Sequence, residues 1–458
     1  MTVPAIEPAA TGTGNAMDRM LLAFVRLWAF ALLLHVCMAD RHRLDTLWGV
    51  AVAALSFAVL VRPASLRLFG ILLIAQLADM VAEMPYSPNH WMLDGFVGLT
   101  ILACFALRRE VTLDALRRAV PGIRIVLLIA YSAAALAKYN TTFLDPVTSC
   151  ASAIASRASF GATRDLPMDP VWMLVTITAE SLIPLLLLIP ATRRHGVRFG
   201  MAFHCLITLS PAIGVQDFSA TLIALFFLFL SAPDAEHLLD RLQRLTGKSA
   251  VVRDVRRFPD VAAFLGLLAI GFAGYVSFAA ASAATNVISK VVLVAVVIAA
   301  VWSWRQPAPT APLAGITWIQ LPMILLTLAW AMNPYLGLRT TASFTMFSSL
   351  TTEGTEANHL FLPSVHLTDW QEDLVYIQSS NDASIDRAAD SDVAIPLMGL
   401  RSIAMNDSDL EVTGVLHGQQ VTFGPEAGQT PLEPLSWWQR KYAHFHAIPV
   451  GDHAFCTD

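Results

Sequence analysis

The chain has 458 residues, of which 55% are hydrophobic and only 14% are charged, and its formal net charge is −5. Soluble globular proteins carry about a quarter charged residues, so this composition excludes that class and indicates a protein with many membrane-spanning helices. No basic run is interleaved with aromatic residues, so we expect membrane lipid, and no nucleic acid, as a partner.

The first 18 residues, 1–18, are small and polar, and they predict a disordered tail. The apolar run 20–38 that follows is long enough to remain as a membrane span, which argues against a cleaved signal peptide. In all, about eleven apolar segments have nearly the length of about 20 residues that a span needs. They are 20–38, 46–62, 66–83, 91–107, 123–139, 171–190, 198–211, 217–232, 260–282, 286–303 and 314–332.

The shortest of these segments can tilt or re-enter, so the sequence predicts a mainly α polytopic membrane bundle with about 9–11 transmembrane helices. Polar side chains are costly in hydrocarbon, and those within the segments should face the bundle interior. These side chains are Gln76, Asp79, Asp94, Glu180 and His204.

Loop charge predicts the orientation, because cytoplasmic loops are enriched in Lys and Arg. The basic connections are 62–67, 108–118, 193–198 and 236–260, and the connections between them are poor in basic residues. We therefore expect the basic set to be cytoplasmic and 84–90, 140–170, 211–217 and 283–287 to be external. Arg41 and Arg43 violate this scheme.

The composition changes after Pro334, where acidic side chains and turn pairs become more frequent. Residues 410–416 and 419–423, joined at His417-Gly418, have the pattern of a β-hairpin. The sequence thus predicts a smaller C-terminal β-rich extramembrane domain on the external side, tied to the membrane face by Trp437-Trp438. The expected domains are a 1–18 tail, a 19–232 transmembrane domain, a 233–334 basic connection with further helices, and a 335–458 external domain.

The five cysteines show neither CxxC spacing nor a metal-ligand pattern, so we predict no metal site. Cys37, Cys104 and Cys205 lie in apolar runs and should be small buried hydrophobes. Cys150 and Cys456 fall outside the membrane in this topology, where they are candidates for a disulfide. The alternative is that both thiols are free.

Lys138 is the only lysine in the first 247 residues, a stretch that holds eighteen arginines. It lies at the end of the apolar run 126–139. A lysine can lose its proton when it is desolvated, whereas a guanidinium effectively cannot, so Lys138 is a candidate base. The alternative is a snorkelling lysine with its ammonium group among the lipid headgroups.

Other polar residues fall on the same expected side of the membrane as Lys138. A histidine, a lysine and carboxylates that share one membrane face predict a proton-handling site. His90 at a helix start should stay near neutral because of the positive end of the helix dipole. The candidate catalytic residues are Lys138 and His90, and the candidate pocket residues are Asn89, Asp94, Tyr139, Glu180, His204 and Asp217.

Each of these residues also has a structural interpretation. Asn89 and Asp217 can cap their helices. His204 on an apolar face is often a core histidine. Glu180, in the same segment as Pro184, can mend hydrogen bonds at a kink.

Three of these segments resemble a known family. Residues 89–95 (Asn-His-Trp-Met-Leu-Asp-Gly) resemble the Asn-His-x-x-Leu-x-Gly of vitamin K-dependent gamma-glutamyl carboxylases. Residues 134–140 (Ala-Ala-Leu-Ala-Lys-Tyr-Asn) are similar to their Ala-Gly-Val-Lys-Lys-Leu-Asp, and 203–205 to their Phe-His-Cys. The likeness covers 20–232 and returns at 344–348. It extends to the wider horizontally transferred transmembrane domain group.

The resemblance implies that Lys138 is the base that deprotonates a reduced naphthoquinone, either vitamin K hydroquinone or menaquinol, with His90 positioning the anion. In that family the quinol anion reacts with dioxygen to form a stronger base. That base removes a γ-proton from glutamate, and the carbanion takes up carbon dioxide. An exported peptide or protein would then be the substrate.

The chain departs from the family at three places. Ala137 stands where the family has its first lysine, and Asn140-Thr141-Thr142-Phe143 replaces a segment with a tryptophan. Residues 350–458 show no counterpart of the substrate-docking region. The quinol-oxidising half therefore has more support than the carboxylating half.

Frequent alanine and arginine with few lysines indicates a bacterial source, so we expect the inner membrane with the site and the C-terminal domain facing the periplasm. A different class of function is also open. The chain can be a non-enzymatic maturation factor for exported proteins or a small-solute transporter whose polar cluster is a substrate cavity.

Overall fold

The computed structural model describes residues 10–38, 43–159, 161, 169–209, 215–246, 287–288, 290–295, 298, 315–354, 356–389, 393–449 and 456. The chain forms two compact units, each assembled from several segments. Unit 1 comprises Met1–Asp79, Asp94–Leu128 and Leu182–Ile324, and unit 2 comprises Met80–Leu93, Ile129–Ser181 and Leu325–Asp458. The predicted span 260–282, and most of 286–303, lie outside the described residues.

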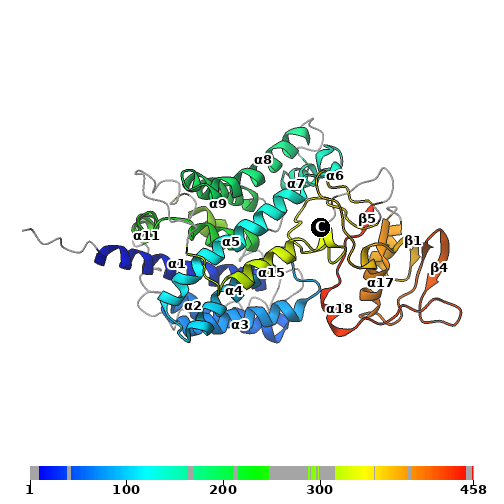
Figure 1. Cartoon of the computed structure of the whole chain (residues 1–458), viewed down its shortest axis with the longest axis horizontal. Helices are drawn as coiled ribbons and strands as arrows, with labels where there is room; N and C mark the ends of the chain where they lie inside the picture. Colours follow the sequence, from blue (N-terminus) through cyan, green and yellow to red (C-terminus); the bar gives the residue numbers. More distant parts are fainter. Residues whose placement is uncertain are drawn as a thin grey trace, which may run out of the picture. The chain divides into compact units, whose positions relative to one another are not determined.

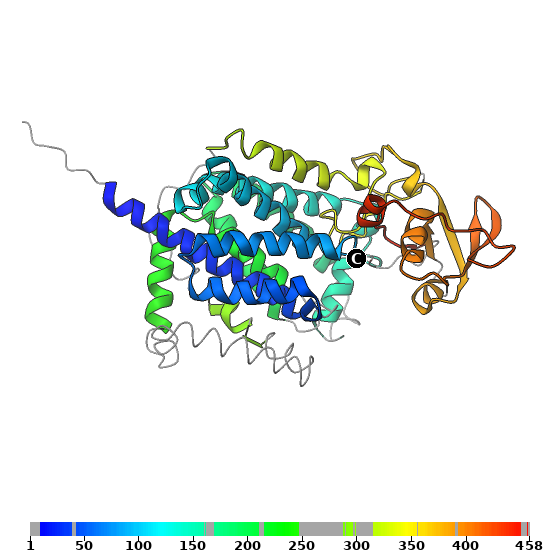
Figure 2. The same ribbon diagram turned by 90° about the horizontal axis from the view of Figure 1, so that it is seen from below.

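Long helices occupy the other predicted apolar segments (Figures 1 and 2). They are α1 (Ala10–Met38), α2 (Leu47–Val61), α3 (Leu66–Glu83), α4 (Asn89–Arg108), α5 (Leu113–Ala137), α8 (Asp169–Leu188), α9 (Arg193–Leu209), α10 (Gln216–Phe227) and α15 (Leu321–Ala331). Among the described helices, four are long and apolar enough to cross a membrane, namely α1 over Asn15–Cys37, α4, α5 and α8. The chain is therefore mainly helical and membrane-associated.

Helix α1 begins earlier than the sequence predicts. It starts at Ala10, inside the segment 1–18 that was expected to be a disordered tail. Two contacts within unit 1 explain the extension. Asp18 accepts a hydrogen bond from Arg117 at 2.8 Å, and Ala16 is buried.

Unit 1 is built around α1, which packs against α2, α10 and α11 (Ala232–Thr246). Trp28 and Phe24 of α1 are fully buried there, with their ring centroids 5.6 Å apart. Closer to the N-terminus of α1, Arg19 forms ion pairs with Glu236 and Asp240 of α11, each at 2.7 Å. Helix α9 packs against α10 on the same unit.

Arg43, one of the two arginines that violate the loop-charge scheme, is not a solvated loop charge. It lies in the short helix η1 (Arg43–Asp45), is buried, and binds the Asp79 carboxylate within unit 1. Asp79 in turn is fully buried. Because Asp79 neutralises its charge inside the protein, Arg43 is not counted among the loop charges that predict the orientation in the membrane.

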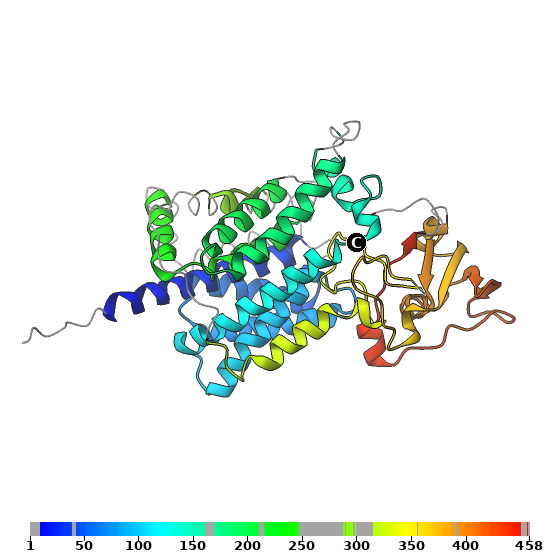
Figure 3. The same cartoon turned by 45° about the horizontal axis from the view of Figure 1, so that its top comes forward.

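Unit 2 contains a five-stranded antiparallel sheet in the order β4-β3-β1-β2-β5, drawn in orange to red in Figure 3. Its strands are β1 (Leu374–Ser380), β2 (Val393–Pro396), β3 (Val412–Leu416), β4 (Gln419–Phe423) and β5 (Ile448–Pro449). The predicted hairpin is confirmed as β3 and β4. His417 and Gly418 connect the two strands with φ of 51° and 76°, the left-handed pair that a two-residue type I′ turn requires.

Two short helices, which the sequence analysis did not predict, cover one face of the sheet. They are α16 (Ala383–Ala389) and α17 (Leu397–Ala404). Ile385 and Leu400 from these helices join Val375, Ile377 and other strand residues in one buried cluster. Helices of seven and eight residues are too short for apolar periodicity to be read from sequence.

Helix α18 (Trp437–Tyr442) joins the C-terminal part of unit 2 to the end of α3 and to the residues after α15. Tyr442 donates a hydrogen bond to Asn333, two residues after α15, and Lys441 donates one to the carbonyl of Ala82 in α3. The tryptophan pair 437–438, which the sequence suggested as the tie, is 66% and 54% exposed. Lys441 and Tyr442 thus bond α18 to other segments of unit 2, while the tie of the tryptophan pair to the membrane face stays a prediction.

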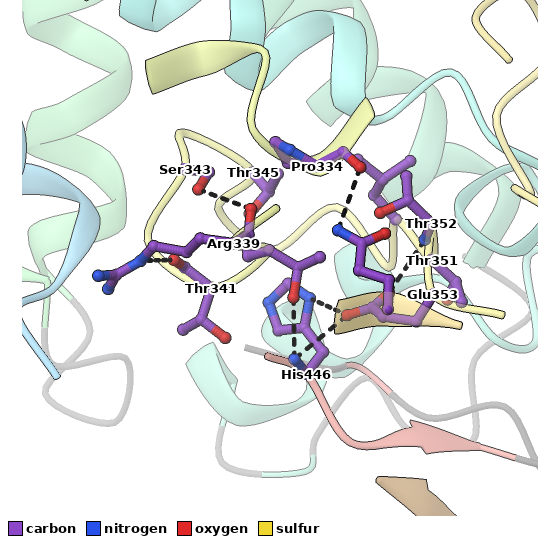
Figure 4. A network of polar contacts seen from close by, with 12 residues as sticks. Pro334, Arg339, Thr341, Ser343, Thr345, Thr351, Thr352, Glu353 and His446 are labelled. Atoms are coloured by element: carbon purple, nitrogen blue, oxygen red, sulfur yellow. Dashed lines mark hydrogen bonds and ion pairs between the residues drawn. The ribbon is translucent and has the colours of Figure 1, made fainter. Parts of the chain in front are cut away.

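A buried polar network connects distant segments of unit 2 (Figure 4). Arg339 is fully buried and donates to the carbonyls of Pro85, Thr341 and Tyr442. Its guanidinium also lies 5.3 Å from the ring centroid of Trp330. Burial lowers the pKa of Arg339 to about 9, which still leaves the group charged at neutral pH.

The same network contains a buried carboxylate and imidazole. Glu353 and His446 face each other in Figure 4, with 3.8 Å between Glu353 Oε1 and His446 Nδ1. The amide of His446 donates to Thr340 Oγ1 at 3.0 Å and to Glu353 at 3.3 Å. These bonds fix β5 against the segment that follows α15.

The predicted disulfide is confirmed, because Cys150 of α7 (Cys150–Ala158) is bonded to Cys456. Cys37, Cys104 and Cys205 are free and buried, as predicted. We expect Cys150→Ser to lower the free energy of unfolding by about 2–4 kcal/mol, as loss of a native disulfide commonly does. Thermal unfolding in detergent measures this effect.

Alkylation provides the control for the disulfide prediction. In unfolded, unreduced protein we expect the reagent to modify the three free cysteines, and to modify Cys150 and Cys456 only after reduction. Modification of all five without reduction would contradict the prediction.

Candidate functional site

Lys138 lies directly after the end of α5 and is 1% exposed, so the snorkelling interpretation is wrong. Its Nζ is 2.8 Å from Glu180 Oε2 on α8 and donates to the carbonyls of Met346 at 2.6 Å and Ala134 at 3.3 Å. Three acceptors match the three N–H groups of an ammonium. The geometry thus suits an ammonium group with Glu180 as its counter-ion.

A second contact joins α5 to α8 beside this ion pair. Tyr139 follows Lys138, Ser181 follows Glu180, and their hydroxyl oxygens are 3.0 Å apart. The Phe143 ring completes the surroundings, with its centroid 5.9 Å from Lys138 Nζ. The amino group of Lys138 is thus surrounded by a carboxylate, two backbone carbonyls and an aromatic ring.

The segment 342–349 supplies the backbone acceptor of Lys138 in a strained conformation. Ala342, Phe344, Phe347 and Ser349 have φ of 58°, 60°, 47° and 52°, in the left-handed region that non-glycine residues rarely adopt. Such residues cost about 1–3 kcal/mol each and cluster at functional sites.

Two asparagines hold the segment 342–349 in place. Asn140 donates from Nδ2 to the carbonyl of Ser348 at 2.7 Å, and Asn89 Oδ1 accepts from the amide of Phe344 at 2.6 Å. The Asn89 oxygen thus serves this segment, in addition to any role at the start of α4. Asn89 and Lys138 thus each form a hydrogen bond to the segment 342–349. His90 directly follows Asn89 in the first turn of α4.

His359, which the sequence analysis missed, fixes a further segment at the end of α5. Its Nε2 lies 3.0 Å from the carbonyl of Leu136, and its Nδ1 accepts from the amides of Phe361 and Leu362 at 3.0 and 2.9 Å. These partners assign the neutral tautomer with the proton on Nε2. Burial lowers the pKa of His359, while its bond to Leu136 raises it by less.

The lowered pKa of His359 predicts a loss of stability in acid. In the unfolded chain the histidine has its ordinary pKa of about 6.5, and in the folded protein its pKa is lower. At pH values between the two, the unfolded state binds more protons than the folded state, which favours unfolding. The full contribution of neutral His359 to stability is therefore present only above about pH 6.5. It should fall as the pH drops from about 6.5 toward the folded pKa. Thermal unfolding at pH 7.5 and pH 5 measures this difference.

The variant His359→Asn, which keeps an acceptor near the Nδ1 position, should show a smaller difference between the two pH values. His446, whose pKa is also lowered by burial, should contribute to the difference that remains. An unchanged pH dependence in the His359 variant would contradict the assignment.

Three of the predicted pocket residues belong to unit 1, and two of them form polar pairs there. Asp217 Oδ2 lies 3.0 Å from His35 Nδ1, and Thr221 donates to Asp94 at 3.2 Å. Sequence analysis missed His35 because the sequence around a single histidine near the end of an apolar run does not indicate that Asp217, 182 residues later, is its partner.

His204 is the third of these residues, and it has a packing environment. Its ring centroid lies 5.3, 5.4 and 5.9 Å from those of Phe203, Phe218 and Phe226, and the residue is buried. The core-histidine interpretation therefore describes His204 better than the catalytic one.

The predicted site residues thus divide between the units. Unit 2 contains Lys138, Glu180, Tyr139, Asn89 and His90, and unit 1 contains Asp94, His204 and Asp217. The comparisons with protein-family models, with curated proteins and with solved structures found no match for this chain. The functional argument consequently depends on the chemistry of the residues themselves.

Proposed function

We propose that this chain is an integral membrane enzyme in which Lys138 deprotonates a reduced naphthoquinone for dioxygen-dependent epoxidation. The observation that carries the proposal is the buried Lys138–Glu180 pair, 2.8 Å apart. Buried charges are costly and intramembrane ionisable groups are functional sites by default. A buried lysine can lose its proton and take it up again, whereas an arginine effectively cannot, so Lys138 can act as a base.

Glu180 gives Lys138 a route to the free amine. A proton that moves from Nζ to Oε2 converts an ion pair into a neutral amine and a carboxylic acid, with no change of net charge. Removal of the pair from water reduces the cost of this transfer, because neutral partners need no solvation. The amine then accepts the quinol proton, and the quinol anion retains the electron pair for reaction with dioxygen.

The position of the segment 342–349 supports the same function. The resemblance to the carboxylases rests in part on 134–140 and returns at 344–348, and residues of these two segments are bonded to each other through Lys138–Met346 and Asn140–Ser348. Two sequence signals separated by some 200 residues thus meet at one lysine.

The disulfide supports the proposed location. Disulfides persist in oxidising compartments, and Cys150 lies 3.0 Å from Ser349 of the same segment. We propose a bacterial inner-membrane protein with Lys138 and the C-terminal domain on the periplasmic face. Vitamin K hydroquinone or menaquinol would be the co-substrate, with dioxygen.

Coupling to carboxylation is the less supported half of the proposal. It requires carbon dioxide and a glutamate-containing exported peptide or protein, and Ala137 replaces the first lysine of the family's pair.

The test is anaerobic incubation of purified protein with reduced naphthoquinones, followed by admission of oxygen and mass spectrometry of the products. We expect the quinone epoxide in excess over a protein-free control. Epoxide at the control level with every naphthoquinol would contradict the proposal.

A transporter is the second candidate, favoured by the buried polar pairs of unit 1. It predicts gradient-driven solute uptake into proteoliposomes that is lost when Asp217, a member of one of these pairs, is substituted. A maturation factor would instead co-purify with one exported partner and show no redox turnover.

A further inference from the structure

The segment 360–367 of unit 2 exposes apolar side chains in an alternating pattern. The outward-pointing residues of its second half are Phe361 (66% exposed), Val365 (53%) and Leu367 (65%), together with Pro363. Ser364 and His366, which alternate with them, are only partly exposed. Successive side chains of an extended segment point to opposite faces, so this one turns apolar groups outward and polar groups toward the protein. A segment with one face in water shows the reverse pattern.

The outward face of the segment carries no charge. His366 has partners inside the protein, because its Nδ1 lies 3.1 Å from Glu372 Oε1 and its Nε2 lies 3.3 Å from the carbonyl of Thr352. Between Asn358 and Asp369 the sequence contains no Lys, Arg, Asp or Glu. An uncharged apolar face of this kind is costly in water and stable against an apolar medium.

One end of the segment is bonded to the end of α5. The amide of Leu360 donates to the carbonyl of Tyr139, two residues after the helix, at 2.9 Å. The rings of Phe361 and Tyr139 are in contact, with their centroids 5.9 Å apart. Helix α5 is one of the four described helices that are long and apolar enough to cross a membrane. Leu360 and Phe361 therefore lie where a spanning helix ends.

The other end of the segment is bonded to the chain that follows α15. The amides of Val365 and Leu367 donate to two carbonyls of η2 (Pro334–Leu336), at 2.7 and 3.0 Å. Helix α15 itself exposes apolar side chains, with Leu325 and Leu328 at 55% and 47%. Both ends of the segment are thus attached at the ends of apolar helices.

We infer that Phe361, Val365 and Leu367 form an interfacial anchor, which inserts into the lipid bilayer beside the ends of α5 and α15. The partner of this surface is the boundary between lipid headgroups and acyl chains, in which apolar side chains are buried about 5–10 Å deep. Burial of apolar area stabilises such an insertion, and no specific polar contact is needed. The inference depends on the membrane association of the chain and not on the quinol chemistry proposed for Lys138.

Nitroxide labels measure the insertion. Full-length protein whose three free cysteines are replaced by alanine receives one new cysteine, Phe361→Cys or Leu367→Cys, and is reconstituted into phosphatidylethanolamine–phosphatidylglycerol vesicles. Electron paramagnetic resonance then measures collisions of the label with oxygen, which concentrates in lipid, and with a water-soluble nickel complex. We expect collisions with oxygen to exceed those with nickel at both positions, in accord with a depth of about 5–10 Å.

Tyr376→Cys is the matched control, because Tyr376 is an exposed aromatic residue of β1 in the same unit. Its label should collide more often with nickel than with oxygen. An excess of nickel collisions at positions 361 and 367 as well would place the segment in water and overturn the inference. Exclusion of both reagents, with spin–spin broadening, would show that a second copy of the chain covers the segment, which would also overturn it.

A photoactivatable phospholipid tests the unmodified protein, so this result does not depend on the folding of the labelled variants. After illumination of the vesicles, mass spectrometry locates the lipid adducts. We expect adducts on the peptide that contains 360–367 and none on the peptide that contains β1. An absence of adducts from 360–367, or equal amounts on the two peptides, would contradict the anchor.

Discussion

Replacing Lys138 by alanine should lower quinol epoxidation about 10²–10⁴-fold, the usual contribution of a general base. The reason is that no other described side chain lies beside Glu180 as an amine able to accept the quinol proton. Product formation per enzyme, measured by mass spectrometry after oxygen is admitted, gives the effect. Lys441→Ala is the matched control, because Lys441 is a lysine of the same unit bonded to a backbone carbonyl, and it should retain activity.

Lys138→Arg separates catalysis from structure. Arginine keeps the positive charge and can pair with Glu180, yet it effectively cannot become a neutral base. We expect a folded, inactive protein. Glu180→Gln should leave substrate binding intact but alter the pH–rate profile, because the amide cannot receive the proton from Nζ. An active arginine variant would refute the role of Lys138 as a base.

Arg339→Ala should cause the largest loss of stability outside the membrane helices. The substitution leaves the carbonyls of Pro85, Thr341 and Tyr442 without their donor in a buried place. A buried group that loses its partner costs about 1–3 kcal/mol, so the three together should cost at least about 3 kcal/mol. The unfolding temperature should fall by about 3 °C, because a chain of 458 residues has a large entropy of unfolding.

Arg401→Ala is the control for this prediction. Arg401 also donates to a backbone carbonyl, that of Glu433, but the bond is exposed. We expect a change of at most about 0.5 kcal/mol, as for other surface substitutions. Equal unfolding temperatures for the two variants would show that burial of Arg339 contributes nothing.

Much of the helical part could be predicted from sequence, because these helices are continuous runs of apolar residues separated by polar connections. The hairpin at His417-Gly418 and the Cys150–Cys456 disulfide were also predicted correctly. Helices α16 and α17 were not, since their burial depends on the sheet beneath them. The start of α1 was wrong because the bond from Arg117 to Asp18 is invisible in a local window.

The candidate site was only partly predictable, for a physical reason. Sequence analysis named Lys138 and Glu180 but not their contact, which depends on how α5 packs against α8. The acceptor on Met346 is a backbone carbonyl, which every residue has, so the residue type does not predict this contact. His35 and His359 were missed because their partners are an aspartate and a carbonyl far away in the chain.

The long separation between Lys138 and Met346 constrains how the protein is made. Lys138 is synthesised 208 residues before Met346, whose carbonyl accepts its hydrogen bond, and Cys150 is synthesised 306 residues before Cys456. At about 5–20 residues per second the ribosome needs roughly 10–40 s and 15–60 s for these intervals. During nascent-chain insertion Glu180, on the next long membrane helix, is consequently the first group able to compensate the lysine.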